Sequence, residues 1–343
     1  MALFLGLLIF SFIVTSILVV PFINLLYKLR FIRQEQKTRD FLGLRTKIFD
    51  KFHKHKAGTP IGGGLLIIVT VALLYAVLYP LIELLGVYMS SVYPVSDELN
   101  ILFFSFFSFG ILGLYDDLLK FFGFSRKGFF GLRLRHKFII QWILALIIAL
   151  LLYNNLGINF VNIPFWGIFK LGVWFVPFAA FVIVTFANAF NITDGLDGLS
   201  SGLLMICLFA FWIISASILD TTLSVFISLW IGAVIAFLYF NIYPARIWLG
   251  DIGALSFGAT LAVVGLLLGK VMALLVIAAP FLIEGGSSLI QILSKKFFKK
   301  RVFAVSPFHL WLQNCGWEEP KIVMRAWLAG IMFALFGLWL AVI

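Results

Sequence analysis

LFLGLLIFSFIVTSILVVPFINLL, residues 3–26, carries no charged side chain along its whole length. About 20 consecutive apolar residues are enough for a helix to cross a bilayer. No basic segment precedes the run, so we expect a retained spanning helix and not a cleaved signal peptide. The rest of the chain has the same character, since 63% of its 343 residues are hydrophobic and only 12% are charged. This composition excludes an ordinary water-soluble domain, in which about a quarter of the residues are charged.

Ten segments are long and apolar enough to be predicted as membrane-spanning helices. Their approximate bounds are 3–26, 61–82, 99–115, 137–153, 171–189, 199–218, 222–240, 252–268, 271–293 and 322–342. Neither an internal repeat nor a second domain is evident. The sequence therefore predicts an all-α, polytopic membrane protein in which residues 1–343 form a single domain.

Positive charge is concentrated in alternate loops. Ten Lys and Arg residues lie in 27–60, six in 116–137, one in 241–251 and six in 294–321, and only three lie elsewhere. Loops rich in Lys and Arg stay in the cytoplasm, so both termini are expected on the periplasmic side of a bacterial inner membrane. The net charge of +11 then reflects this bias and an attraction to anionic lipid. Nucleic-acid binding is not expected.

The first group of polar residues is GLYDDLLK at residues 113–120. Asp116 and Asp117 close an apolar segment, and Lys120 follows Asp116 by one helical turn. Two adjacent carboxylates at this position form either a charged helix end or part of a phosphate–metal site, because Mg²⁺ prefers oxygen ligands.

The second group is NAFNITDGLDG at residues 188–198. Asn188, Asn191, Asp194 and Asp197 recur at intervals of three. If the segment stays helical, these side chains form one polar stripe. The alternative is a polar cap that joins two spans.

The third group is NIYPARIWLGDIG at residues 241–253. Asp251 is expected either to cap the N-terminus of the next helix or to ligate magnesium beside a helix end that also suits phosphate. Trp248 is a candidate for stacking on a nucleobase, although tryptophan is also common at membrane interfaces.

Two ionisable residues come later in the chain. His309 ends SPFH, residues 306–309, after a basic aromatic loop that we expect to lie on anionic lipid. A lone histidine is more often structural than catalytic. Glu284 lies inside a predicted helix, four residues after Pro280, where a kink is expected. An ionisable group at membrane depth is a functional candidate, and its alternative is pairing with a buried cation.

All these groups fall at or near the cytoplasmic ends of predicted spans. They are expected to converge into an acidic cleft rimmed by lysines at the cytoplasmic face. Metal-assisted phosphoryl transfer is the reaction class that fits such a cleft. A membrane transporter with an acidic site is the alternative from a different class, and it would need acids near mid-bilayer in broken, symmetry-related helices.

The motifs resemble the polyprenyl-phosphate N-acetylhexosamine-1-phosphate transferase superfamily, or glycosyltransferase family 4, and within it the muramoyl-pentapeptide branch. The resemblance covers nearly the whole chain. Its most specific elements are the Asp116–Asp117 pair and the Asn-x-x-Asp-Gly-x-Asp-Gly segment at 191–198. It implies a ten-helix homodimer in which UDP-MurNAc-pentapeptide and undecaprenyl phosphate react, with Mg²⁺, to give lipid I and UMP.

The resemblance also implies roles for particular residues. Asp251, with Asn191, would ligate magnesium, and Asp116 or Asp117 would interact with the lipid phosphate. A direct attack would use one of these two aspartates as a base, whereas a covalent route would use one as the nucleophile. His309 joins these three aspartates as a candidate catalytic residue. The candidate substrate-binding residues are Lys56, Thr59, Lys120, Lys137, Asn188, Asn191, Asp194, Asp197, Asn241, Trp248, Gly250 and Glu284.

One departure from the family pattern concerns the histidine loop. The family usually has three consecutive histidines where this chain has His309, Leu310 and Trp311. This difference keeps a second enzyme alternative open, a transferase that moves HexNAc-1-phosphate from a UDP-N-acetylhexosamine to a polyprenyl phosphate.

Overall fold

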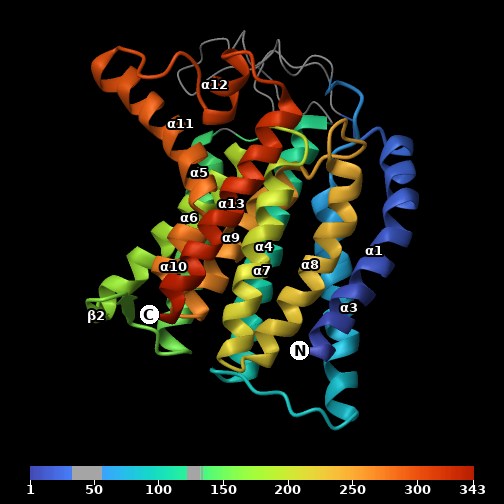
Figure 1. The fold of residues 1–343 in the computed structure, drawn as a ribbon, viewed down its shortest axis with the longest axis vertical. Coiled ribbons are helices and arrows are strands. Elements are labelled where there is room, and N and C mark those ends of the chain that lie inside the picture. The colour runs from blue at the N-terminus through green and yellow to red at the C-terminus, as the bar shows by residue number, and fades with distance from the viewer. Residues whose placement is uncertain (33–55, 122–131, 133) are drawn as a thin grey trace.

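The computed structural model describes residues 1–32, 56–121, 132 and 134–343. This part of the chain folds into a bundle of long helices (Figure 1). Nine of its helices are long and apolar enough to cross a membrane, and a bent pair supplies a tenth candidate span. The prediction of about ten spans is therefore confirmed, and the protein is a multi-pass membrane protein.

The helices follow the predicted segments closely, and several extend beyond them. Their bounds are α1 Ala2–Lys28, α3 Gly63–Leu84, α4 Val95–Phe121, α5 Leu134–Asn154, η2 Gly172–Trp174, α6 Phe175–Thr193, α7 Leu199–Ser217, α8 Thr221–Asn241, α9 Gly250–Leu267, α10 Val271–Ile277, α11 Ala279–Phe298, α12 Phe308–Asn314 and α13 Glu319–Val342.

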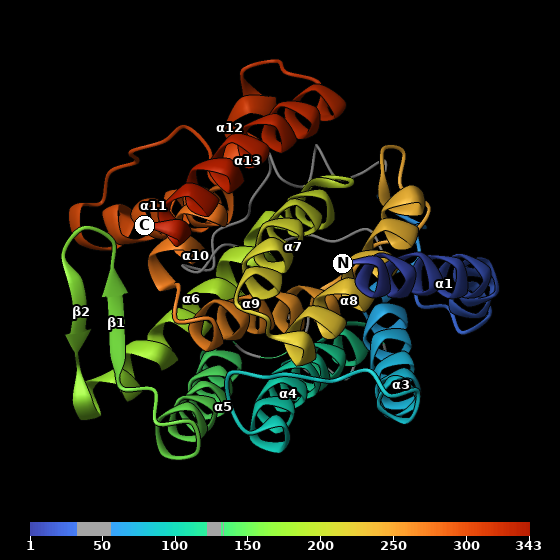
Figure 2. The same cartoon turned by 60° about the horizontal axis from the view of Figure 1, so that its bottom comes forward.

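Helix α9 lies at the centre of the bundle (Figure 2). In its most apolar window 94% of the residues are buried, against 22% for α1 at the edge. Lipid is as apolar as the helices, so packing holds such a bundle together more than the hydrophobic effect does. Small residues let the backbones approach, and a Cβ added to Gly64 of α3 would lie only 2.3 Å from the backbone of Gly253 of α9.

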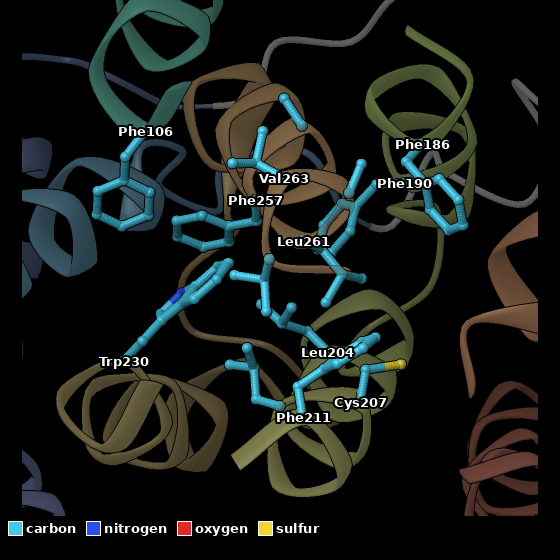
Figure 3. Packing of buried hydrophobic residues seen from close by; sticks show 14 of the residues in the cluster. Phe106, Phe186, Phe190, Leu204, Cys207, Phe211, Trp230, Phe257, Leu261 and Val263 are labelled. Atoms are coloured by element: carbon cyan, nitrogen blue, oxygen red, sulfur yellow. The ribbon is translucent and has the colours of Figure 1, made fainter. Parts of the chain in front are cut away.

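Large aromatic side chains fill the space around α9 (Figure 3). The ring of Trp230 from α8 lies edge-on to Phe106 of α4 and Phe257 of α9, with both centroid distances 5.4 Å. Edge-to-face contacts of this kind add stability beyond the burial of area. This cluster fixes α4, α8 and α9 relative to one another.

The predicted span 271–293 is two helices with a 77° bend between them. The break falls at Ala278, and Pro280 lies in the first turn of α11. Proline is tolerated there because the first N–H groups of a helix have no partner within the helix. The expected kink is confirmed, and α11 leans away from the bundle (Figure 1).

The chain is not purely α-helical. A hairpin of β1, Phe160–Ile163, and β2, Gly167–Lys170, joins α5 to α6. The turn between the strands has positive φ angles at Phe165 and Gly167, which reverse the chain in a few residues. The all-α prediction is wrong in this detail.

Both termini lie at the same end of the bundle, and α12 lies at the other (Figure 1). The terminal end also holds two buried acids, Glu98 and Asp220. Asp220 is the N-cap of α8, since its Oδ1 accepts a hydrogen bond from Leu223 N at 3.0 Å. Burial raises the pKa of the Asp220 carboxyl above its ordinary value.

Candidate active site

The site begins where the C-terminal end of α4 meets the N-terminus of α9. A Cβ added to Gly113 would lie 2.2 Å from the carbonyl oxygen of Asp251, so only glycine allows this approach. Gly250 begins α9 with φ +80°, and a Cβ there would lie 2.8 Å from Asp117 Oδ2. Because neither glycine has a side chain, the Asp116–Asp117 pair can lie directly against the first turn of α9.

Five charged side chains from three helices meet at this junction, and we call them the charged centre. They are Asp116, Asp117 and Lys120 of α4, Lys137 of α5 and Asp251 of α9. Lys120 Nζ lies 3.1 Å from Asp116 Oδ2 and 2.9 Å from Asp251 Oδ2. Lys137 Nζ lies 2.9 Å from Asp116 Oδ2 and also contacts Asp251. The predicted convergence of these residues is confirmed.

The two adjacent aspartates face different surroundings. Asp116 accepts hydrogen bonds from Lys137 and, at 2.6 Å, from the backbone N–H of Leu132. Asp117 Oδ2 accepts the backbone N–H of Ile252 at 3.2 Å, and its nearest cation is Lys120 at 3.5 Å. Asp116 therefore lies between the lysines, whereas Asp117 is anchored to α9.

Asp251 does not cap α9. The N-cap residue is Leu249, which has no side-chain cap hydrogen bond, and Asp251 lies within the first turn. The N-terminal dipole still favours its negative charge there. With a side chain that is 19% exposed, Asp251 is the most accessible carboxylate of the charged centre.

A second ionic cluster ties the start of α13 to the turn between α6 and α7. Lys56 Nζ lies 2.9 Å from Asp197 Oδ1 and also contacts Glu319 Oε1. Glu319 in turn accepts the backbone N–H of Asp197 at 2.7 Å, and Asp197 accepts that of Ala245 at 3.0 Å. All three charged side chains are buried. Lys56 is thus the cation shared by two buried carboxylates.

We expect Lys56→Met to lower the free energy of unfolding by about 3–5 kcal/mol, the usual cost of leaving a buried ion pair without one partner. Two buried carboxylates would lose the cation that both contact. Thermal unfolding in detergent measures the effect. Lys170→Met removes the same charge from an exposed position on β2 and should change stability by less than about 0.5 kcal/mol. Equal effects of the two substitutions would contradict the structural role of Lys56.

Glu319 was not among the residues predicted from the sequence. An acid directly before Pro320 is typical of a helix N-terminus, and that signal gave no indication of a partner. Glu319 and Lys56 are 263 positions apart, so only the fold brings them together.

The predicted polar stripe of residues 188–197 is split, because α6 ends at Thr193. Asn188 and Asn191 lie on α6, Asp194 is its C-cap, and Asp197 lies in the following turn. Gly198, with φ +78°, is the N-cap residue of α7. The condition for one stripe, a continuous helix, is therefore not met, and the substrate-binding role of these four residues stays a prediction. Asp194 accepts a hydrogen bond from Ser200 Oγ at 2.6 Å.

Three other candidates lie in or beside the segment that follows α8. Asn241 accepts from Ser201 Oγ at 2.5 Å and donates to Ile247 O at 2.9 Å, so its amide links α7 to this segment. Trp248 is buried, and its ring lies 4.8 Å from Lys56 Nζ. The backbone N–H of Trp248 donates to Pro60 O at 2.8 Å, next to the half-buried Thr59. The stacking role of Trp248 stays a prediction.

His309 of α12 and Glu284 of α11 form a pair apart from the two ionic clusters. His309 Nδ1 lies 3.0 Å from Glu284 Oε2, and the backbone N–H of His309 donates to the same carboxylate. In a neutral ring this contact places the proton on Nδ1 and leaves Nε2 as an acceptor. A Cβ added to Gly195 would lie 2.5 Å from Nε2. Because Gly195 has no side chain, the His309 ring can lie directly against the turn after α6.

The charged centre has a donor set that fits magnesium. Lys137 contacts both Asp116 and Asp251, so oxygens from two helices converge on one point. Mg²⁺ in phosphoryl-transfer sites takes one or two carboxylates and completes its shell with water and substrate phosphates. Among the described residues, no three His, Cys, Asp or Glu side chains are grouped as in an all-protein metal site. Asp251, with the most accessible carboxylate, is the residue that would hold the ion, and the predicted second ligand, Asn191 of α6, stays a prediction.

Comparison with known proteins agrees with this site. Residues 99–269, which include all five residues of the charged centre, match the family described as Glycosyl transferase family 4. The fold and the site thus define a membrane-embedded glycosyl transferase of family 4.

The relatives narrow this class further. The chain is 36% identical to the phospho-N-acetylmuramoyl-pentapeptide-transferase of Clostridium perfringens (strain SM101 / Type A), over 91% of this chain and 89% of the relative. It is 38% identical to the enzyme of the same name from Chloroflexus aggregans, over 85% of this chain and 79% of the relative. The chain belongs to the phospho-N-acetylmuramoyl-pentapeptide-transferase family.

Proposed function

We propose that this protein transfers phospho-MurNAc-pentapeptide from UDP-MurNAc-pentapeptide to undecaprenyl phosphate, with lipid I and UMP as products. This is the first membrane step of peptidoglycan synthesis. The observation that carries the proposal is the charged centre, where three carboxylates and two lysines from α4, α5 and α9 meet at one end of a membrane bundle. Membership of the family supports the choice of donor and acceptor.

The reaction joins an oxygen of the lipid phosphate to the β-phosphorus of the nucleotide sugar. The bond from that phosphorus to the bridging oxygen breaks, and UMP leaves. Lys120 and Lys137 are placed to bind phosphate oxygens once these replace the carboxylates they now contact. Asp116, between the two lysines, is the group that would accept a proton from the lipid phosphate. Magnesium at Asp251 would neutralise charge on the transferred phosphoryl group.

The charge balance explains why a metal is part of the proposal. Three carboxylates against two lysines leave the charged centre with a formal charge of −1, so an anionic diphosphate would be repelled. A divalent cation reverses the sign of that charge. The distribution of Lys and Arg favours a cytoplasmic location for this end of the bundle, with both termini periplasmic. The homodimer implied by the family resemblance stays a prediction.

The experiment is release of UMP by purified protein in detergent with undecaprenyl phosphate. UDP-MurNAc-pentapeptide and UDP-GlcNAc are offered in parallel, each with and without magnesium. Magnesium-dependent release from the first donor alone is the expected result. Release from UDP-GlcNAc alone would favour the HexNAc-1-phosphate alternative, and no release from either donor would contradict both.

We expect His309→Ala to lower kcat/KM by at least about tenfold, because the ring that joins α12 to Gly195 and Glu284 is lost. UMP release measures the change. Cys207→Ala is the control, since Cys207 is buried in the apolar core of α7 and should affect stability more than turnover. Equal losses of turnover in both variants would favour a purely structural histidine.

A further inference from the structure

Gln141 of α5 has a buried side-chain amide, and the reaction proposed above assigns no role to it. Its side chain is 1% exposed, and its Oε1 accepts a hydrogen bond from Asn188 Nδ2 at 2.8 Å. It follows Lys137 by four residues on the same helix, so the two side chains share a helix face. Gln141 therefore lies one turn further into the bundle than the charged centre.

The orientation of the Gln141 amide is fixed by its neighbours. Asn188 Nδ2 also donates to the carbonyl oxygen of Val184 at 2.8 Å. A backbone carbonyl only accepts hydrogen bonds, so Asn188 must present its NH₂ group to Val184. The same NH₂ group donates to Gln141, so the atom of Gln141 that accepts this hydrogen bond must be the amide oxygen. The Nε2 group of Gln141 is thereby turned away from Asn188.

Gln141 Nε2 is buried and has no hydrogen-bond partner within the described part of the chain. The same holds for Asn191 Nδ2, which lies on α6 one turn after Asn188. A buried donor without an acceptor destabilises a fold, whereas an apolar side chain of the same shape does not. The contact with Asn188 accounts for Oε1, and no contact in the described part of the chain accounts for the NH₂ group at position 141.

The missing partner must be an acceptor. The carboxylates of the charged centre are already engaged by Lys120 and Lys137. The reaction proposed above brings phosphate groups to those lysines, and phosphoryl oxygens are strong acceptors. Gln141 lies one turn after Lys137 and shares a face of α5 with it, so it is the nearest buried amide along this helix to the lysines.

We propose that Gln141 Nε2 donates a hydrogen bond to a phosphoryl oxygen of a bound substrate. The oxygen belongs either to the diphosphate of the UDP-sugar or to the lipid phosphate. This inference rests on the proposed function, because it takes its acceptor from that reaction. Asn188 is then a positioning residue, since its hydrogen bond sets the direction of the donor.

The test compares Gln141→Met and Gln141→Glu with the wild-type protein in the UMP-release assay, each substrate being varied in turn. Met removes the donor and keeps an unbranched chain. Glu keeps the oxygen that Asn188 needs and faces the phosphate with a negative charge. We expect kcat/KM to fall about tenfold to a hundredfold in both variants, with Glu the worse. An increased KM for the nucleotide sugar or for the lipid phosphate identifies the source of the oxygen.

The melting temperature separates this role from a structural one. Nε2 has no partner among the described residues, so Gln141→Met removes only the hydrogen bond that Oε1 accepts from Asn188, and its melting temperature should fall only slightly. Trp212→Phe is the matched control, since it removes another buried and unpartnered N–H, from α7, and should leave turnover unchanged. Wild-type kcat/KM in Gln141→Met, or a large drop in its melting temperature, would overturn this inference alone. No turnover by the wild-type protein would overturn the proposed function as well.

Discussion

Asp251→Asn is expected to slow UMP release by about 10²–10³-fold, because a metal ion supplies several kcal/mol of charge stabilisation in the transition state. An amide is a weaker magnesium ligand than a carboxylate. The fold should survive the change. Asp251 shares both of its lysines with Asp116, so neither cation is left without a partner. The loss should be largest at limiting magnesium.

Asp97→Asn is the matched control for this substitution. It makes the same chemical change at the opposite end of α4, where Asp97 accepts a hydrogen bond from Asn155 Nδ2 at 3.0 Å. Its turnover should equal that of the wild-type protein at every magnesium concentration. If Asp251→Asn keeps wild-type turnover at limiting magnesium, the metal assignment to Asp251 is wrong.

The spans could be predicted from the sequence because the bilayer sets one length for every helix. The break between α10 and α11 could be predicted from Pro280. Its 77° angle depends on the helices that pack around it, and no local signal contains that information. The β1–β2 hairpin was missed because its strands are four residues long, which is too short for a clear alternation of apolar and polar residues.

The members of the charged centre were predicted, and their pairing was not. Asp116, Lys120 and Asp251 are marked by charge at the ends of apolar segments. The contact of Gly113 with the backbone of Asp251 sets which helix ends meet, and a glycine in an apolar run gives no sign of its partner. Sequence reasoning thus finds charged helix ends more readily than the contacts between them.

The polar segment 188–198 illustrates the opposite failure. Its interval of three residues suggested a continuous helix, but Gly195 and Gly198 allow the chain to turn after Thr193. The hydrogen bond of Trp327 Nε1 to Gly198 O at 3.1 Å comes from α13, far away in the sequence. Tertiary contacts therefore overrode the local periodicity, and Asp197 was directed to Lys56 instead of to the charged centre.

Asp116→Asn is expected to lower kcat/KM for the lipid phosphate by about 10²–10⁴-fold, the usual contribution of a general base. Asp116 lies between Lys120 and Lys137, so a phosphate bound by these lysines would be next to its carboxylate. An amide at this position cannot accept the proton. The measurement is UMP release with undecaprenyl phosphate as the varied substrate.

Asp117→Asn is the control that the chain itself offers, because it makes the same change at the adjacent residue. An amide oxygen at position 117 can still accept the N–H of Ile252, which is the bond that anchors Asp117 to α9. We therefore expect a loss of about tenfold or less, equivalent to roughly 1.4 kcal/mol. The order of the two losses decides the assignment: if Asp117→Asn is the more severe, the proton acceptor is the anchored aspartate, and the lysines serve Asp116 only as structural partners.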